Sequence, residues 1–533
     1  TGDLFKNKLR QRNNSEYYHM VDAYLSYDNT FNHHHIRGLV GFNYEQDYQK
    51  NLYSTMMDIQ SNNLNDFNLG NHTEGVSLEG GQYEWALESF FGRVGYDWKG
   101  RYLAEVNLRW DASSRFRRDK RAAVFPSVSA GWRVSEEPFF APIRNTFSNF
   151  KIRGSFGSLG NQAISSPYPY IQTLDLLQQN YLVNGEFLTY ASVSAPTAGN
   201  FTWETVVHGN LGLDLGFFNN RLTFAGDLYI RDTKDMLVPG KTLPGVYGAA
   251  SPKENAADLR TKGYELTLSW NDKFNLAGKP FTYGVSFALG DNISKITKYD
   301  NPTKDFNVSQ YYEGMTIGEI WGYKIDGLFK TDEEAAAYQA EIDHSLIAKN
   351  ILQTATGKYK GLKAGDPKFV DLDGNGRIDD GEKTANNRGD MRVIGNSRPR
   401  YNYSGSINLG WNGFDISAFF QGVGRQHRYP DGNAMLFWGG YARPYSSFVP
   451  EHFLDDVWSE DNPDAYFPKL RGYAAQGDRH LAKVNNRYLQ NTAYCRLKNL
   501  TVGYTLPVDL TRKARIDRVR VYFNNSTKKL LYV

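Results

Sequence analysis

Residues 371–382, DLDGNGRIDDGE, have the spacing of a twelve-residue EF-hand calcium loop. Glycine stands at position 376, where this loop makes its sharp turn. Hard oxygen ligands rich in carboxylate favour Ca²⁺ over transition metals. The expected oxygen donors are the side chains of Asp371, Asp373, Asn375, Asp379 and Glu382 and the backbone carbonyl of Arg377.

The same twelve residues could also form an acidic turn without an ion, because no flanking pair of EF-hand helices is expected beside them. We favour the ion site, since the match covers the whole template. A Ca²⁺ there would stiffen a long loop. No pair of acidic residues in the sequence stands out for acid–base work, so the motif does not predict an enzyme.

Aromatic residues are abundant in the segments expected to be long loops. Aromatic rings stack on sugars and also pack against partner proteins, so these residues are candidates for substrate or partner contacts. Packing within the loops is the alternative. The candidates are Tyr168, Tyr170, Trp203, Trp438, Tyr441, Tyr445 and Trp458.

The segments that position these loops alternate between apolar and polar residues. In residues 401–421 two alternating arms flank Asn412-Gly413, a dipeptide suited to a two-residue type I′ turn. Similar alternation in residues 21–28, 102–110, 222–231 and 264–270 predicts strands with two different faces. The expected polar face includes Glu105, Asn107, Arg109, Asp227 and Glu265, and the expected apolar face includes Tyr102, Val106, Leu108, Phe224, Leu228 and Leu266.

These alternating segments are about ten residues long, which is enough for a tilted strand to cross a bilayer. Hydrophobic residues make up 40% of the 533, and no run of 18 apolar residues occurs, which excludes a helical membrane protein. A net charge of +3 with balanced signs gives no reason to expect nucleic-acid binding. We therefore expect a transmembrane β-barrel with the polar face inside.

Short and long connections alternate along the chain, as in outer-membrane barrels with short periplasmic turns and long extracellular loops. Lys99-Gly100 and Asn412-Gly413 are short, whereas residues 47–84 and 296–398 are long. The last of these contains a predicted helix over residues 331–349 and the segment 371–382. We count a dozen to fourteen strands.

Several collinear segments resemble the SusC/RagA family of TonB-dependent outer-membrane transporters of Bacteroidota. The resemblance spreads along nearly the whole chain. Its most specific segments are YLAEVNLRWDASSRF (102–116), FPSVSAGWRVSEEPF (125–139), KGYELTLSW (262–270), GDPKFVDLDGNGRID (365–379) and YLQNTAYCRLKNLTVGYTLP (488–507).

The resemblance implies an all-β fold in which residues 1–533 form part of a 22-stranded barrel in the Gram-negative outer membrane. The family's plug domain, TonB box and closing strand have no counterpart here, so we expect TonB to act through a missing N-terminal region. A SusD-like surface lipoprotein is the implied partner, and oligosaccharides or peptides are the implied cargo. A scaffold subunit without transport, or a secreted all-β carbohydrate-binding protein, are the alternatives.

Overall fold

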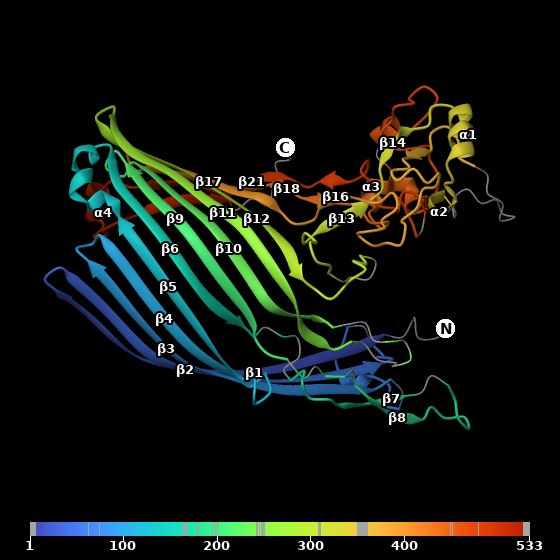
Figure 1. The fold of residues 1–533 in the computed structure, drawn as a ribbon, viewed down its shortest axis with the longest axis horizontal. Helices are drawn as coiled ribbons and strands as arrows, with labels where there is room; N and C mark the ends of the chain where they lie inside the picture. Colours follow the sequence, from blue (N-terminus) through green and yellow to red (C-terminus); the bar gives the residue numbers. More distant parts are fainter. Residues whose placement is uncertain are drawn as a thin grey trace. The chain divides into compact units, whose positions relative to one another are not determined.

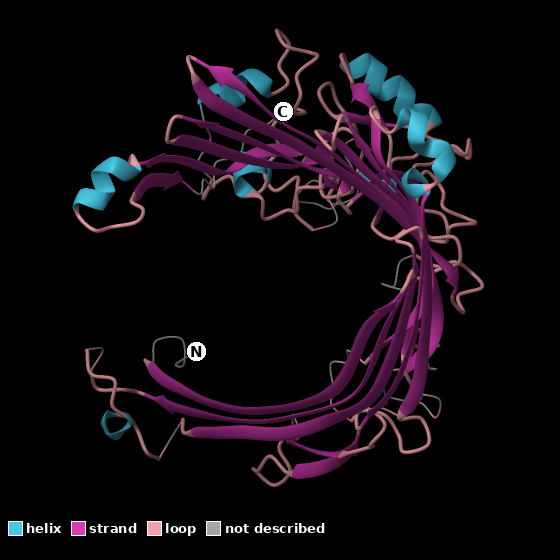
Figure 2. Ribbon diagram, turned by 90° about the vertical axis from the view of Figure 1, so that its left-hand side faces the viewer, coloured by secondary structure: helices cyan, strands magenta, loops and turns pink. Residues whose placement is uncertain are grey.

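The computed structural model describes residues 7–525 except 62, 74, 163, 165–167, 179–180, 195, 198, 200, 241–243, 245, 247–250, 307–310, 349–360, 448, 450 and 478. Strands make up most of the ribbon, and the few helices lie in the connections (Figures 1 and 2). Among the described residues, no helix is long and apolar enough to cross a bilayer.

Fourteen strands form one sheet, which confirms the expected large antiparallel sheet and the expected number of strands. The strands are hydrogen-bonded in chain order, with β1 and β22 at the two ends of the order. They are β1 (Lys8–Phe31), β2 (His34–Met57), β3 (Ser77–Trp98), β4 (Tyr102–Ser113), β5 (Ala122–Arg133), β6 (Phe147–Asn161), β9 (Glu204–Phe217), β10 (Leu222–Pro239), β11 (Lys253–Leu276), β12 (Lys279–Lys298), β17 (Arg400–Trp411), β18 (Phe414–Arg425), β21 (Tyr494–Thr505) and β22 (Arg520–Asn525).

The chain divides into two units, which we describe separately. Unit 1 comprises residues 1–141, 151–211 and 231–258, and unit 2 comprises residues 142–150, 212–230 and 259–533. In unit 1, β1 to β5 lie side by side (Figure 1). β1 and β2 each have 24 residues and pair without a register shift from Lys8↔Met57 to Phe31↔His34. The expected strand length of ten residues and the expected long loop over 47–84 are therefore wrong for these strands, because backbone pairing continues well past the span that a bilayer requires.

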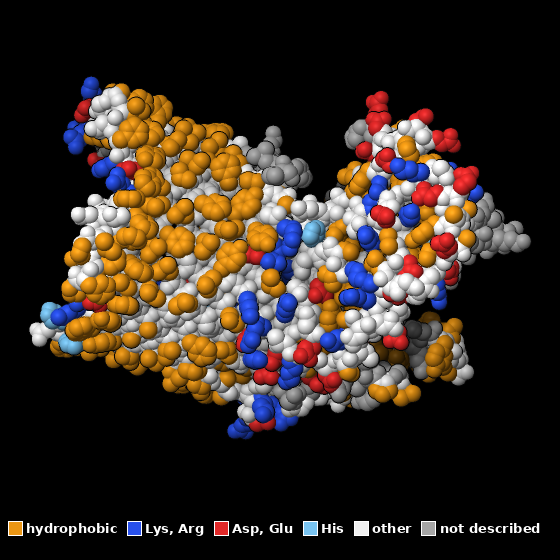
Figure 3. All heavy atoms as spheres, turned by 45° about the horizontal axis from the view of Figure 1, so that its top comes forward, with side chains coloured by type: hydrophobic (Ala, Val, Ile, Leu, Met, Phe, Trp, Pro, Cys, Tyr) orange, Lys and Arg blue, Asp and Glu red, His pale blue; other side chains and the backbone are white. Residues whose placement is uncertain are grey.

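The two faces of the sheet differ as the alternation predicts. On β4, the side chains of Val106 and Leu108 are 53% and 54% exposed on an apolar face. Arg109 lies on the opposite face and donates hydrogen bonds to Asp111 Oδ1 at 2.7 Å and Ser89 Oγ at 2.8 Å. In Figure 3 hydrophobic side chains gather over the strands, and charged side chains gather over the loops and at the rim of short turns.

Both predicted two-residue turns have the backbone that a type I′ turn requires. φ is +54° at Lys99 and +68° at Gly100, and it is +46° at Asn412 and +87° at Gly413. Gly413 joins β17 to β18, which pair from Trp411↔Phe414 onward.

In unit 1 a small, mostly aromatic core joins the strands to the connections: Leu87 lies on β3 and Phe125 on β5, whereas Phe116, Phe201 and Trp203 lie between strands. The hairpin of β7 (Leu174–Gln178) and β8 (Thr189–Val193) lies between β6 and β9 in the sequence, and the 3-10 helices η2 (Phe67–Leu69), η3 (Val134–Glu136) and η4 (Pro138–Ile143) lie in other connections.

In unit 2 the described parts of the connections over residues 299–399 and 426–493 form what we call the loop assembly. Among these described residues its larger core has 14 buried members, including Trp438, Tyr441 and Tyr488. Its elements are β13 (Glu319–Gly322), β14 (Ile325–Leu328), α1 (Asp332–Glu341), α2 (Ser345–Ala348), β15 (Pro367–Phe369), β16 (Arg392–Asn396), β19 (His427–Arg428), α3 (Met435–Trp438), η6 (Gly439–Tyr441), η7 (Glu451–Asp456) and β20 (Gln490–Asn491). One further helix, α4 (Val508–Lys513), lies between β21 and β22.

The helix predicted over residues 331–349 begins where expected, because the Thr331 side chain accepts a hydrogen bond from Glu334 N at 3.1 Å. It ends early, however, and α2 follows as a separate short helix. His344, between the two helices, is buried, and its ring contacts Tyr338. Lys349 lies outside the described residues.

Candidate functional site

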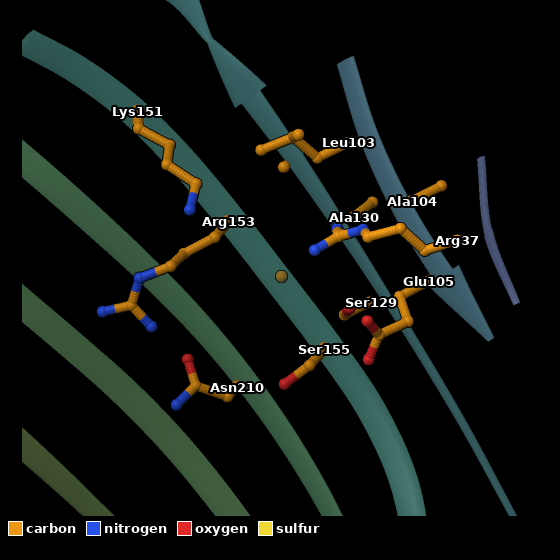
Figure 4. Close-up of a pocket in the computed structure, with 12 residues that line it drawn as sticks. Arg37, Leu103, Ala104, Glu105, Ser129, Ala130, Lys151, Arg153, Ser155 and Asn210 are labelled. Atoms are coloured by element: carbon orange, nitrogen blue, oxygen red, sulfur yellow. The ribbon is translucent and has the colours of Figure 1, made fainter. Parts of the chain in front are cut away.

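A hollow of about 320 Å³ lies on the polar face of unit 1. Figure 4 shows Arg37 and Glu105 on one side of it and Lys151, Arg153 and Asn210 on the other. We call it the polar-face pocket and define it by Arg37, Glu105, Ser129, Lys151, Arg153, Ser155 and Asn210.

The register of five neighbouring strands assembles the polar-face pocket. Arg37 on β2 pairs with Gly95 on β3, Gly95 pairs with Glu105 on β4, and Glu105 pairs with Ser129 on β5. Ser129 in turn pairs with Ser155 on β6. Residues paired across a sheet point to the same face, so this one row carries a cation, an anion and two hydroxyl groups side by side.

One glycine provides space for a long basic side chain. A Cβ atom on Gly131 would lie 3.3 Å from Lys151 Cε, which is a tight contact, whereas one on Gly95 would lie at an ordinary contact distance of 3.5 Å from Arg37 Nε. Three cations, Arg37, Lys151 and Arg153, and one carboxylate, that of Glu105, line the hollow. The Glu105 carboxylate accepts a hydrogen bond from Asn107 Nδ2 at 3.1 Å. Within the described part of the chain, Arg37 and Lys151 form no ion pair. The pocket is therefore suited to binding an anionic or hydroxyl-rich group.

In the loop assembly, the segment 371–382 is tightly turned. The three glycines at 374, 376 and 381 all have positive φ. The carboxylate of Asp371 accepts hydrogen bonds from Gly374 N at 2.7 Å and Gly376 N at 2.8 Å. Ile378 is buried in the core, and its N–H donates to Asp343 O at 2.9 Å.

Three carboxylates in this region, those of Asp371, Asp373 and Asp390, have oxygens within 4.8 Å of one another. Of the six predicted donors, only Asp371 and Asp373 belong to this group. The Asn375 side-chain oxygen accepts from Arg377 N at 2.8 Å, Asp379 Oδ1 accepts from Gly381 N at 2.9 Å, and Glu382 is exposed. Asp390, eight residues beyond the predicted loop, takes part instead. Its two oxygens accept from Leu372 N at 2.5 Å and Asp379 N at 2.8 Å.

The donor chemistry of this acidic group fits a hard cation, because three carboxylates converge and none forms an ion pair with a described basic residue. Asp390 is fully buried. Burial raises the pKa of Asp390, and the carboxylates of Asp373 and Asp371 raise it further. A divalent cation would relieve this repulsion.

The seven candidate aromatic residues have different environments. Trp203, Trp438, Tyr441 and Trp458 are buried, which supports the alternative of packing within the protein for these four. Tyr168 and Tyr170 are half-buried, and their hydroxyls donate to the backbone carbonyls of Glu84 and Ser114. Tyr445 is 91% exposed and stays a candidate for contact.

Sequence alternation placed Glu105 on the polar face but did not identify the pocket. Arg37, Lys151, Arg153 and Asn210 lie on strands that are far apart in sequence, and only the register reveals that they converge. The sequence signal that could have revealed the pocket was the recurrence of a cationic residue on the polar face of several strands.

Sequence and fold together define the class of the protein. Residues 2–341 match the family described as "TonB dependent receptor-like, beta-barrel", and the chain belongs to this family. It is an outer-membrane β-barrel protein of the TonB-dependent receptor class.

Among individual proteins, the chain is similar to TonB-dependent receptor P3 of Formosa agariphila, with 28% identity over 94% of this chain and 47% of the relative. It is also 28% identical to the TonB-dependent receptor SusC of Bacteroides thetaiotaomicron over 79% of this chain and 38% of the relative. The chain spans about half the length of the receptors from Formosa agariphila that it matches. A solved structure of the RagAB peptide transporter shares the fold, with a TM-score of 0.76, 22% identity, and coverage of 98% of this chain and 52% of that chain.

Proposed function

We propose that the protein forms the membrane barrel of a SusC-like importer, which takes up oligosaccharides or peptides together with a SusD-like surface lipoprotein and is energised by TonB. The observation that carries this proposal is the two-faced sheet: one face is apolar and suited to lipid, and the other carries the polar-face pocket. In a barrel the polar face lines the interior, which is the route of cargo. Similarity to SusC supports the SusC-like class, and the fold shared with the RagAB peptide transporter supports peptides as one cargo class.

A test of this function compares cells that express the complete gene with cells that lack it. We expect labelled oligosaccharides or peptides to enter only when the gene and TonB are both present. Charge reversal in the pocket by Arg37→Glu with Lys151→Glu should slow uptake about tenfold, the effect of losing about 1.4 kcal/mol of binding free energy.

Arg118→Glu serves as the matched control, since Arg118 is an exposed cation outside the pocket. A folded barrel that imports neither cargo class, with or without TonB, would instead support a scaffold role. If the pocket and control variants changed uptake equally, the pocket would have no specific role in transport.

We further propose that Asp371, Asp373 and Asp390 help to hold one structural Ca²⁺ in the loop assembly. Bound there, the ion would neutralise the three carboxylates and stiffen the connection between β12 and β17. The segment 371–382 supplies further oxygen donors, including the Arg377 carbonyl.

A further inference from the structure

The apolar face of unit 1 contains a groove of about 870 Å³. Gly38 and Gly92 form its floor, and Val40, Val94 and Leu108 are among the side chains around it. A Cβ atom on Gly38 would meet nothing nearer than Tyr27 Cβ at 3.9 Å, and one on Gly92 nothing nearer than Leu39 O at 3.7 Å. Packing within the protein therefore does not require glycine at either position, and the space above them is open.

An aromatic row crosses the same face near the short turns. Tyr102 pairs across the sheet with Trp98 on one side and with Trp132 on the other. Its ring centroid is 5.6 Å from that of Trp98 and 6.4 Å from that of Trp132. Such rows mark the membrane–water interface of β-barrels. Glu137 holds this row in place, because its carboxylate accepts from Tyr102 Oη at 2.6 Å and from Trp132 Nε1 at 3.1 Å.

Basic groups lie beside the aromatic row. Lys99 Nζ is 4.9 Å from the centroid of the Trp98 ring, and Arg133 Nη1 donates to Gly100 O at 3.3 Å. Arg101 is paired with Glu137 at 3.5 Å. Lys99 is exposed and forms no ion pair with any described residue, so one cation remains available to an external anion beside the aromatic row. Arg133 pairs with Lys151 of the polar-face pocket and therefore belongs to the opposite face.

The groove and Lys99 are separated by about the hydrocarbon thickness of one lipid leaflet. Val94 pairs with Val106 beside the groove, and Trp98 pairs with Tyr102 four residues farther along both strands. Four strand residues span about 13 Å. Half of a bilayer's hydrocarbon core is about 15 Å thick, so the groove lies at the depth that an acyl chain reaches from the interface.

We propose that this wall is a specific binding site for one anionic glycerophospholipid. Lys99 binds its phosphate, and one acyl chain lies in the groove over Gly38 and Gly92. The short turns of an outer-membrane barrel face the periplasm, where the adjoining leaflet is built of glycerophospholipids. A second copy of the protein fits less well, because a protein partner would have to fill the groove and leave Lys99 unused.

The experiment titrates the protein, expressed from its complete gene and freed of lipid in detergent, with phosphatidylglycerol and follows adducts by native mass spectrometry. We expect one saturable adduct. Lys99→Gln should weaken it about fivefold, the effect of one cation at a membrane surface. Gly92→Val fills the groove, and displacing two methylenes should weaken binding about tenfold.

Gly209→Val is the matched control for the groove variant. Asn210 points into the polar-face pocket, so Gly209 lies on the apolar face, and a Cβ atom there would meet nothing nearer than Phe156 Cδ2 at 3.8 Å. It should bind lipid like the unmodified protein. Heat-modifiable gel migration checks that each variant is folded. If Gly92→Val does not fold, the effect of Lys99→Gln on lipid binding tests the proposal by itself.

Three outcomes would overturn the proposal. Phosphatidylcholine that binds as tightly as phosphatidylglycerol would indicate ordinary surrounding lipid. Binding of lipid A in preference, unaffected by Lys99→Gln, would place the ligand in the other leaflet. A dimer that Gly92→Val dissociates, without a lipid adduct, would make the groove an interface between copies.

Discussion

The strand wall of unit 1 and the loop assembly of unit 2 are stabilised in different ways. Between β1 and β2, 24 consecutive residue pairs follow one register. In the loop assembly, β13 and β16 form only four pairs with a register shift, and the core instead gathers buried aromatic residues. Contacts such as Asn486 Oδ1 with Ile325 N at 2.7 Å join residues 161 positions apart. The wall thus depends on local alternation, whereas the loop assembly depends on a few distant contacts.

The largest expected effect tests the core of the loop assembly. Trp438 is fully buried, and its indole N–H donates to Pro430 O at 3.2 Å and Asp431 O at 3.1 Å. Trp438→Ala should cost about 3–5 kcal/mol of local stability. Hydrogen exchange across residues 435–488 should rise roughly 150-fold or more, while exchange in β1 to β5 should not change.

Leu108→Ala is the counterpart on the strand wall. It removes an exposed side chain, and surface substitutions of this kind usually change stability by less than about 0.5 kcal/mol. If Trp438→Ala unfolded the strands together with the loops, the two regions would form one cooperative structure and the contrast between them would fail.

A second difference between the regions should appear as a pH dependence. His480 is buried in the loop assembly, and burial lowers its pKa to about 4, with Asp366 acting in the opposite direction and Arg471 in the same direction. The unfolded chain binds a proton at this histidine below about pH 6.5, but the folded chain does not until about pH 4. The free energy of unfolding of the loop assembly should therefore fall by about 3 kcal/mol as pH falls through this window.

His480→Gln should flatten that dependence, and His19→Gln, at an exposed position on β1, should leave it unchanged. Burial also lowers the pKa of His344, so a smaller slope of the same sign should persist in the His480 variant. Protease resistance of the loops between pH 4 and pH 7 provides the measurement. Loops that become more resistant to protease as the pH falls would contradict the expected loss of stability at low pH.

Removal of Ca²⁺ should weaken the loop assembly and spare the strand wall. An ion present at about 100 times its dissociation constant stabilises the folded state by about 2.7 kcal/mol. Chelation should therefore speed proteolysis within residues 299–399, and Asp373→Ala should have the same effect even with Ca²⁺ present. Asp380→Ala is the control, since Asp380 lies in the same segment but pairs with Lys383 at 3.0 Å outside the acidic group. Equal rates with Ca²⁺ and with chelator would identify residues 371–382 as an acidic turn.

Sequence predicted the strand wall well because its signals are local. Lys99-Gly100 marked the short turn between β3 and β4, and the alternation around Val106 specified its face. The sequence analysis misplaced the end of β2 and the start of β3. Beyond the bilayer the paired strands no longer carry an alternating apolar face, so their sequence looks like that of a loop. In the loop assembly, composition alone did not separate the buried Trp438 from the exposed Tyr445. Asp390 was missed because only the folded chain brings it back to Asp371.

The smallest predicted effect tests the difference between strands and loops at a turn of the sheet. Gly413 has a φ of +87°, and a Cβ atom there would lie 2.7 Å from Thr505 O. Gly413→Ala should therefore destabilise the β17–β18 hairpin by about 1–2 kcal/mol, the usual cost of a left-handed conformation for a residue with a side chain. Gly405→Ala on β17 is the control, because its φ is not positive and its Cβ would lie 3.4 Å from Ser286 O. Hydrogen exchange should rise at β17 and β18 in the first variant only. If each strand is stabilised mainly by its pairing with its neighbours, the rise in hydrogen exchange should not extend beyond one neighbouring strand. Exchange in residues 435–488 should then stay the same. An equal rise in those residues would show that the hairpin and the loop assembly unfold together.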